Sequence, residues 1–204
     1  MSQSKKRQWH KAHTKDPFVR AARDQGYRSR AAFKLKQVQE CYKILQPGQS
    51  VVELGSAPGA WTQYMSTILN KSGQLVACDL LPMDSVKGVT FIQGDFLAHS
   101  TQQAIRASLS ETCTLIVSDM SPNLTGNRIT DQARMSELVE SVLAFCEQNL
   151  SQDGSLLVKV FNGVEFDTIH DQMKVLFAQV KVIKPEASKR ASKEVYLLGQ
   201  KYQV

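Results

Sequence analysis

Long apolar runs and closely spaced cysteines are both missing from this sequence. No apolar stretch approaches the roughly 20 residues of a membrane-spanning helix, and the first residues lack the apolar core of a signal peptide. We therefore expect a soluble, cytoplasmic protein. The four cysteines form no C-x-x-C pair, which predicts reduced, packed thiols and argues against a zinc site or a disulfide framework. They are Cys41, Cys78, Cys113 and Cys146. His10 and His13 have no cysteine nearby, so we expect no bound metal.

Acidic residues are scarce at the N-terminal end of the chain. Residues 1–36 contain 11 lysines and arginines but only two acids, a local net charge of +9. The remaining residues contain 14 basic and 17 acidic side chains, so they carry −3 of the total of +6. A nearly neutral globule with a basic arm predicts a polyanionic partner such as RNA or DNA. A solvated tail that only aids solubility is the alternative.

The chain of 204 residues is long enough for one domain with a sizeable core, and it shows no internal repeat. Apolar segments predict strands at 50–54, 74–79, 89–93, 113–119, 155–161, 180–185 and 194–200. Between them, helices are predicted at 29–44, with Ser29 as the N-cap, and at 58–70, 99–109, 130–149 and 165–178. Strands that alternate with helices are typical of a doubly wound α/β sheet, with ligands at the carboxyl ends of the strands. We expect residues 1–26 to form a basic, partly disordered arm and residues 27–204 to form the domain.

The dinucleotide-binding pattern G-x-G-x-x-G is absent as well. Residues 51–61 (VVELGSAPGAW) predict a buried strand that runs into a tight turn between Gly55 and Gly59, where the backbone can approach a ligand closely. Ala57 stands at the place of the second glycine, and Pro58 lies where helix amides would bind a pyrophosphate. The loop suits a cofactor without phosphates, for which S-adenosylmethionine is the obvious candidate, although such turns can also be purely structural.

Two acids follow later strands of the predicted sheet. Asp79 ends the second strand, where a carboxylate can accept both hydroxyls of a ribose. Asp95 ends the third strand, where an acid could accept the adenine amino group while Phe96 packs nearby. Each acid alone could be a loop cap or a surface charge. The order of the three features along the chain favours a cofactor site.

The fourth predicted strand ends in residues 118–123 (SDMSPN), and in methyltransferases this position faces the methyl group. The segment lacks the Asn/Asp-Pro-Pro-aromatic pattern of enzymes that methylate base amino groups. Cytosine C5 methylation needs a nearby cysteine, but Cys113 begins its strand and would lie at the far end of the sheet. A hydroxyl remains as the acceptor, and a hydroxyl needs a base.

Lys159 lies in an apolar segment, residues 156–161, that predicts a buried parallel strand. An unpaired buried ammonium is costly, so such a lysine is kept when its amine does chemistry or when a carboxylate neutralises it. Desolvation and a second ammonium would help Lys159 to lose its proton and to act as the base. For Lys34 and Glu194, spacing alone indicates no more than solvent-facing charges.

Seven short motifs follow one another in order between about Tyr27 and Leu198. They are 28–35 (RSRAAFKL), 55–61 (GSAPGAW), 78–83 (CDLLPM), 93–96 (QGDF), 118–123 (SDMSPN), 158–161 (VKVF) and 192–196 (SKEVY). Together they resemble the FtsJ/RrmJ (RlmE) family of ribosomal RNA methyltransferases. The resemblance implies a single Rossmann-like, S-adenosylmethionine-dependent methyltransferase domain, with a mostly parallel seven-stranded sheet and helices on both faces.

The resemblance also implies an activity and a set of site residues. Bacterial members of the family methylate the 2′-oxygen of a uridine in the A-loop of 23S rRNA, in the assembled large ribosomal subunit. The implied catalytic tetrad is Lys34, Asp119, Lys159 and Glu194. Lys159 would accept the proton, Asp119 would orient its amine near the sulfonium, and Lys34 and Glu194 would position the ribose. The implied cofactor-binding residues are Gly59, Trp61, Asp79, Asp95 and Asp119, with no metal and a monomeric protein.

Two residues depart from the family pattern, and the partner of the site stays open. Glu53 stands where aspartate is usual, and Ala60 replaces a glycine; we expect neither to abolish cofactor binding.

Arg28, Arg30 and Lys36 would grip RNA phosphates. One alternative keeps the chemistry but changes the substrate to a tRNA anticodon loop or a cap ribose. A second is a non-catalytic RNA-binding ribosome assembly factor, and a nicotinamide-dependent oxidoreductase is a more distant third.

Overall fold

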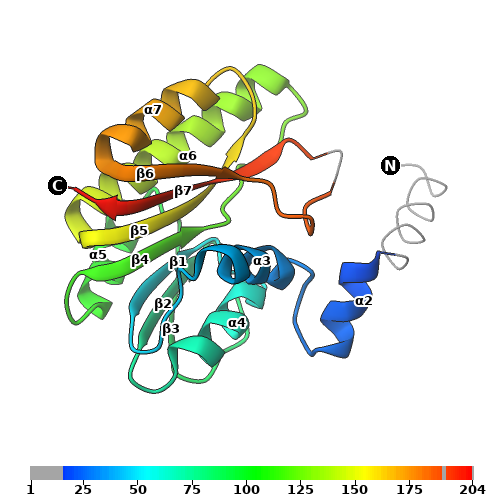
Figure 1. The fold of residues 1–204 in the computed structure, drawn as a ribbon, viewed down its shortest axis with the longest axis vertical. Coiled ribbons are helices and arrows are strands. Elements are labelled where there is room, and N and C mark those ends of the chain that lie inside the picture. Colours follow the sequence, from blue (N-terminus) through cyan, green and yellow to red (C-terminus); the bar gives the residue numbers. More distant parts are fainter. Residues whose placement is uncertain (1–15, 190–191, 204) are drawn as a thin grey trace.

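The computed structural model describes residues 16–189 and 192–203, and within them seven strands form one sheet (Figure 1). The strands are β1 (Ser50–Leu54), β2 (Gln74–Asp79), β3 (Val89–Gln93), β4 (Cys113–Ser118), β5 (Leu150–Phe161), β6 (Phe177–Ile183) and β7 (Glu194–Tyr202). Their order in the sheet is β3-β2-β1-β4-β5-β7-β6. Strands β1 to β5 pair in parallel, whereas β7 runs antiparallel to both β5 and β6. The predicted mostly parallel, seven-stranded sheet is confirmed.

Helices cover both faces of this sheet (Figure 1). They are α2 (Pro17–Asp24), α3 (Ala32–Tyr42), α4 (Ala60–Leu69), α5 (His99–Ser108), α6 (Arg128–Asn149) and α7 (Phe166–Leu176). Leu35 of α3 and Met65 of α4 pack with Val51 on one face of the sheet. Val142 of α6 packs with Val52 on the other face, together with side chains of α5 and α7. Because successive strand residues point to opposite faces, the neighbours Val51 and Val52 enter different cores, and the central strands are apolar on both sides.

Several predicted boundaries need correction. Ser29 is not the N-cap of α3, because the helix begins at Ala32 and Ala31 occupies the cap position. The Ser29 hydroxyl instead accepts a 3.2 Å hydrogen bond from the Ala31 amide, in a turn that precedes the helix. The helix predicted to reach residue 178 ends at Leu176, since Phe177 already pairs with Tyr202 in the sheet. Pairing with β7 outweighs the local helical pattern there.

Helix α2 was not predicted from the sequence, although its start has clear local signals. Asp16 is the N-cap and accepts a 2.9 Å hydrogen bond from the Phe18 amide, with proline at the first helical position. Phe18 and Ala22 pack against Phe33 of α3. Part of the expected basic arm is therefore a docked helix. Residues 1–15, with His10 and His13, lie outside the described residues, and the division between an arm and a domain at residue 26 stays a prediction.

Three of the four thiols are buried as expected, namely Cys78, Cys113 and Cys146, whereas Cys41 is exposed. Burial raises the pKa of Cys78 and of Cys113 to about 12, so both remain protonated thiols at neutral pH. In the part of the chain that the structure describes, no group of three or more His, Cys, Asp or Glu residues could hold a metal ion. None of the described helices combines the length and the apolar character needed to cross a membrane.

Candidate active site

Lys159 lies at the centre of a charged cluster at the carboxyl edge of the sheet. Its side chain projects from β5 and is only 5% exposed. The Lys159 ammonium lies 3.1 Å from Asp119 Oδ1 and 3.8 Å from Glu194 Oε1, and it donates a 2.6 Å hydrogen bond to the Asp119 carbonyl. The buried amine is therefore compensated by charge and by a hydrogen bond, which a buried ammonium requires.

Lys34, on α3, is the second cation of the cluster. Its ammonium lies 3.9 Å from Asp119 Oδ1 and 3.7 Å from Glu194 Oε2. Two cations and two carboxylates thus surround one point between α3, β4, β5 and β7. The structure brings all four residues of the implied tetrad together, although spacing alone gave Lys34 and Glu194 no role.

The sheet explains why these side chains meet. The Asp119 amide donates a 3.0 Å hydrogen bond to the Leu54 carbonyl, which keeps Asp119 in line with β4 beside β1. In the antiparallel pair of β5 and β7, Lys159 is opposite Tyr196, and Phe161 is opposite Glu194. Because residues two apart in a strand point to the same face, Glu194 and Tyr196 both face the amine of Lys159.

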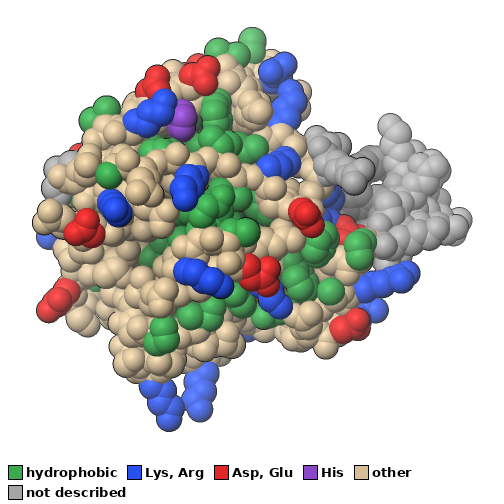
Figure 2. Space-filling view, in the orientation of Figure 1, with side chains coloured by type: hydrophobic (Ala, Val, Ile, Leu, Met, Phe, Trp, Pro, Cys, Tyr) green, Lys and Arg blue, Asp and Glu red, His purple; other side chains and the backbone are tan. Residues whose placement is uncertain are grey.

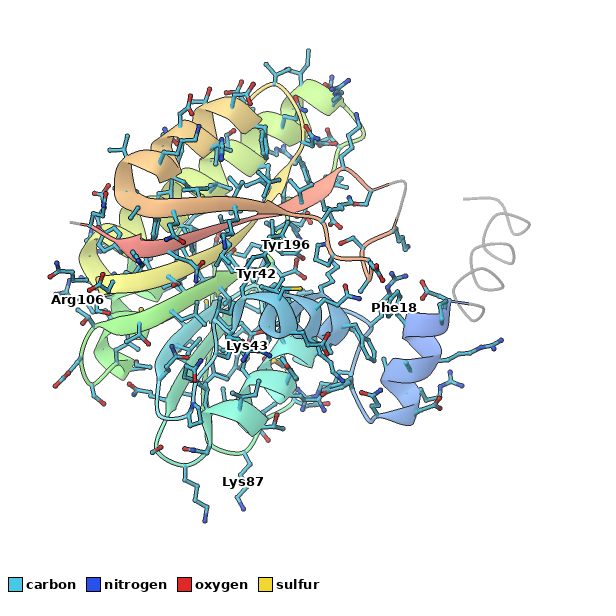
Figure 3. The ribbon with its side chains drawn as sticks, viewed as in Figure 1. Phe18, Tyr42, Lys43, Lys87, Arg106 and Tyr196 are labelled. Carbon is cyan, nitrogen blue, oxygen red and sulfur yellow. The ribbon has the colours of Figure 1, made fainter. Side chains whose placement is uncertain are left out.

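Tyr196 is a site residue to which the sequence analysis assigned no role. Its hydroxyl donates a 2.6 Å hydrogen bond to Asp119 Oδ1 and accepts one of 3.2 Å from the Lys34 ammonium. Burial, reinforced by the carboxylate of Asp119, raises the pKa of Tyr196 well above its usual value, so the phenol keeps its proton. Figure 3 shows Tyr196 of β7 close to α3. Its position two residues after Glu194 on a predicted strand was the available signal.

A cavity of about 500 Å³ adjoins this cluster at the ends of β1, β2, β3 and β4. The predicted acids Asp79 and Asp95 both line it. Asp79 accepts 2.8 Å hydrogen bonds from the amides of Ala57 and Leu81, and Asp95 accepts one of 3.0 Å from the Leu97 amide. A carboxylate has about four lone-pair positions, so both acids retain capacity to accept hydrogen bonds from a ligand.

Two glycines shape the loop between the cavity and α4. Gly55 has a φ of +79°, and a Cβ on it would lie 2.7 Å from the Met120 amide nitrogen, so only glycine lets the two loops approach this closely. Gly59 has a φ of +102°, and the Arg28 side chain occupies the space that a Cβ would fill. The Arg28 guanidinium holds the loop by donating hydrogen bonds to the carbonyls of Pro58, Asp84 and Ser85, at 2.8 to 3.0 Å.

The other implied cofactor residues lie beside the cavity rather than in its lining. Asp119 directly precedes Met120, which lines the cavity, so it joins the cavity to the charged cluster. The indole of Trp61 is buried in the core under α3. Contacts of Gly59, Trp61 and Asp119 with a cofactor therefore stay predictions.

Glu53 is a buried acid beneath the cavity loop. Its side chain accepts a 2.6 Å hydrogen bond from the Thr62 hydroxyl. Burial, together with the nearby carboxylates of Asp119 and Asp79, raises the pKa of Glu53 to about 8. The carboxyl group that replaces the usual aspartate is therefore mostly neutral at pH 7.

The expected phosphate-gripping arginines have internal partners in this structure. Arg28 donates to the three carbonyls of the cavity loops, and Arg30 pairs with Asp16 and donates to the Ala187 carbonyl. Both guanidinium groups hold segments of the chain together, which differs from the role that we expected. Other basic side chains, including the exposed Lys43 and Lys181, lie on the face formed by α3, β6 and β7. Figure 2 shows lysines and arginines scattered over this face, with apolar side chains between them.

The sequence model of the FtsJ-like methyltransferase family matches residues 27–202. The chain belongs to this family. It is 43% identical over 195 residues to the "Ribosomal RNA large subunit methyltransferase E" of Acinetobacter baylyi, covering 95% of this chain and 90% of the relative. The protein of the same name from Acinetobacter baumannii has the same identity and coverage. Membership in the FtsJ-like family confirms the resemblance and makes the chain a methyltransferase, so the oxidoreductase alternative is wrong.

Solved structures agree with this FtsJ-like fold. A Plasmodium falciparum protein assigned as a ribosomal RNA methyltransferase superposes with a TM-score of 0.77 at 26% identity, over 86% of this chain and 98% of the other. A Clostridium thermocellum protein assigned as an rRNA methylase superposes with a TM-score of 0.55 at 13% identity, over 82% of this chain and 97% of the other. That second likeness shows the fold alone. A methyltransferase of this family implies a methyl donor of the S-adenosylmethionine type.

Proposed function

We propose that this FtsJ-like enzyme transfers a methyl group from S-adenosylmethionine to the 2′-oxygen of a uridine in the A-loop of 23S rRNA, in the assembled large ribosomal subunit. The observation that carries the proposal is the buried amine of Lys159, held by Asp119 and Glu194 beside a nucleoside-sized cavity. The names of the two Acinetobacter relatives support ribosomal RNA as the substrate.

The cavity fits the proposed methyl donor. Its volume is within the range of small-molecule sites, and Asp79 and Asp95 offer carboxylates where hydroxyls and an amino group need acceptors. Trp61 lies in the first turn of α4, where a helix leaves its amides without intrahelical partners, so these amides could bind the methionine carboxylate. Together with Gly59 and Asp119, these residues would hold S-adenosylmethionine. When bound, it supplies an electrophilic methyl group on a sulfonium.

Lys159 would act as the proton acceptor in its neutral form. Its amine then has two N–H bonds, and the Asp119 carbonyl and Asp119 Oδ1 lie at 2.6 and 3.1 Å to accept them. The lone pair is left for the proton of the ribose hydroxyl, a poor nucleophile until that proton is removed. After proton transfer, the new ammonium is stabilised by the carboxylates of Asp119 and Glu194.

Lys34 and Glu194 would position the ribose. They face each other at 3.7 Å across the more exposed side of the cluster, where a substrate can enter. A cation and a carboxylate at this point can hold the sugar hydroxyls and align the 2′-oxygen with the methyl group, and alignment is a major part of catalysis.

The charge distribution supports an RNA partner. The net charge of +9 in residues 1–36 is suited to contacts with phosphates, which make binding sensitive to salt. Because RNA helices hide their major groove, the enzyme would act on a splayed-out nucleotide presented by the shape of the rRNA. The proposal keeps the cytoplasmic location and monomeric state expected from the sequence.

The test is transfer of tritiated methyl groups from S-adenosylmethionine to large ribosomal subunits from a strain that lacks this gene, with tRNA in a parallel reaction. Nucleoside analysis should find labelled 2′-O-methyluridine in 23S rRNA. Label only in tRNA would keep the chemistry but refute the substrate. No label in either RNA, from protein that binds S-adenosylmethionine, would refute both RNA substrates.

A further inference from the structure

The indole of Trp61 connects the helix that carries Lys34 to the helix that follows the cavity loop. Trp61 is 3% exposed, and its Nε1–H donates a 2.7 Å hydrogen bond to the Ala31 carbonyl. The same carbonyl accepts a 3.0 Å hydrogen bond from the Lys34 amide. The indole therefore holds the turn from which the Lys34 side chain projects.

The ring of Trp61 also supports Tyr196. The two ring centroids are 5.8 Å apart, with the planes tilted by 39°. Tyr196 in turn donates to Asp119 Oδ1 and accepts from the Lys34 ammonium. One side chain thus touches both groups that place Lys34 and Asp119 relative to Lys159.

We propose that Trp61 is a positioning residue whose indole sets the places of Lys34 and Tyr196, and not a surface on which the methyl donor rests. The inference rests on the proposed function, since positioning is measured through methyl transfer. It differs from the cofactor contact that the family resemblance implies for this residue, but it leaves the Trp61 backbone amide free for such a contact. A displacement of about 1 Å in a catalytic group can slow a reaction about 100-fold.

Two substitutions separate the contribution of the indole N–H from that of the aromatic ring. Trp61→Phe keeps a ring against Tyr196 but removes the N–H that binds Ala31, and Trp61→Leu removes both. Met65→Leu is the matched control, because Met65 lies one turn further along α4 in the same buried core and has no N–H to donate. Thermal unfolding of each variant measures its loss of stability.

Three measurements test the inference. Calorimetry gives the Kd for S-adenosylmethionine, single-turnover transfer at saturating S-adenosylmethionine gives the rate, and hydrogen exchange gives the protection of the Lys34 amide. For Trp61→Phe we expect a Kd within about 3-fold of the parent, a rate about 10-fold lower and faster exchange at Lys34; the rate of Trp61→Leu should fall by about 100-fold. Met65→Leu should change neither the rate nor the exchange by more than about 2-fold.

Two results would overturn the inference. A Kd about 10-fold weaker with an unchanged rate at saturation would make the indole a cofactor contact. The rate and the exchange profile of Trp61→Phe could also match those of Met65→Leu. In that case the indole would contribute only core packing and would have no positioning role. Absence of methyl transfer by the parent protein would refute the proposed function instead, and the Lys34 exchange rates would still show whether the indole holds this turn.

Discussion

Lys159 and Tyr196 are directly opposite each other in the antiparallel pair of β5 and β7, and both side chains reach the same oxygen, Asp119 Oδ1, at 3.1 and 2.6 Å. Directly opposite residues project to the same face of a sheet, so the register of β7 decides which groups the buried amine meets. The antiparallel strand β7 supplies Glu194 and Tyr196, so without it the cluster would lack one carboxylate and the phenol that donates to Asp119.

Replacing Lys159 by methionine should greatly slow methyl transfer while leaving cofactor binding intact. Methionine has a similar length but no proton-accepting amine, so we expect the single-turnover rate to fall about 100- to 10,000-fold. The Kd for S-adenosylmethionine, measured by calorimetry, should stay within about 3-fold, because Lys159 does not line the cavity. Lys174→Met, at an exposed lysine on α7, is the control. A Lys159→Met enzyme with more than about a tenth of the parent rate would contradict the role of a base.

Tyr196→Phe should slow transfer about 10- to 100-fold without preventing folding, because Asp119 loses its 2.6 Å donor and Lys34 loses an acceptor. The raised pKa of Tyr196 means that the phenol keeps its proton up to at least pH 10. The shape of the pH–rate profile up to this pH should therefore be the same in the parent and the variant. A falling limb near pH 10 that disappears in Tyr196→Phe would show that the phenol ionises there.

Glu53→Gln should change how stability depends on pH. The folded-state pKa of about 8 lies above the unfolded value of about 4.5, so the stabilising contribution is present below pH 4.5 and is lost as the pH rises toward 8. The loss is on the order of 5 kcal/mol. Glutamine has no proton to lose, so denaturant unfolding should find the variant close to the parent at pH 4.5 and more stable at pH 9. Parallel stability curves across this range would contradict a buried, protonated Glu53.

Asp79→Asn should weaken binding of S-adenosylmethionine by about 10-fold or more. The substitution removes the negative charge, and an NH2 group replaces one of the two carboxylate oxygens that face the cavity and its loops. Calorimetry measures the Kd directly. At saturating S-adenosylmethionine the transfer rate should recover, since Asp79 does not touch the lysine cluster. Asp153→Asn, at an exposed position of positive φ within β5, is the control and should leave the Kd unchanged. An unchanged Kd in Asp79→Asn would remove this acid from the proposed cofactor site.

Much of the fold could be predicted from local patterns. The bounds of β1, β2 and β3 were predicted to the residue, because each is a short run of apolar side chains between turn-forming residues. Less was predictable where partners distant in the chain decide the structure. The end of α7 and the start of β6 depend on pairing with β7, and α2 depends on packing against Phe33.

The candidate site likewise has some residues that local sequence could reveal and others that it could not. Lys159 could be noticed from the sequence because a lysine in a buried apolar strand is costly wherever that strand lies. No local pattern assigned a role to Lys34 or Glu194, and only the resemblance to the FtsJ family did. The internal partners of Arg28 and Arg30, and the role of Tyr196, became visible only with the structure.

By itself the sequence determined the class of fold, the basic charge of residues 1–36 and the glycine turn, because apolar periodicity, charge and backbone freedom are properties of neighbouring residues. The tertiary structure alone decided which charges meet. Lys34 and Glu194 are far apart in the chain, and their ammonium and carboxylate come within 3.7 Å only because β7 lies beside β5 and α3 packs over the sheet. Electrostatic interaction depends on distance in space, and that distance is set by strand order and register.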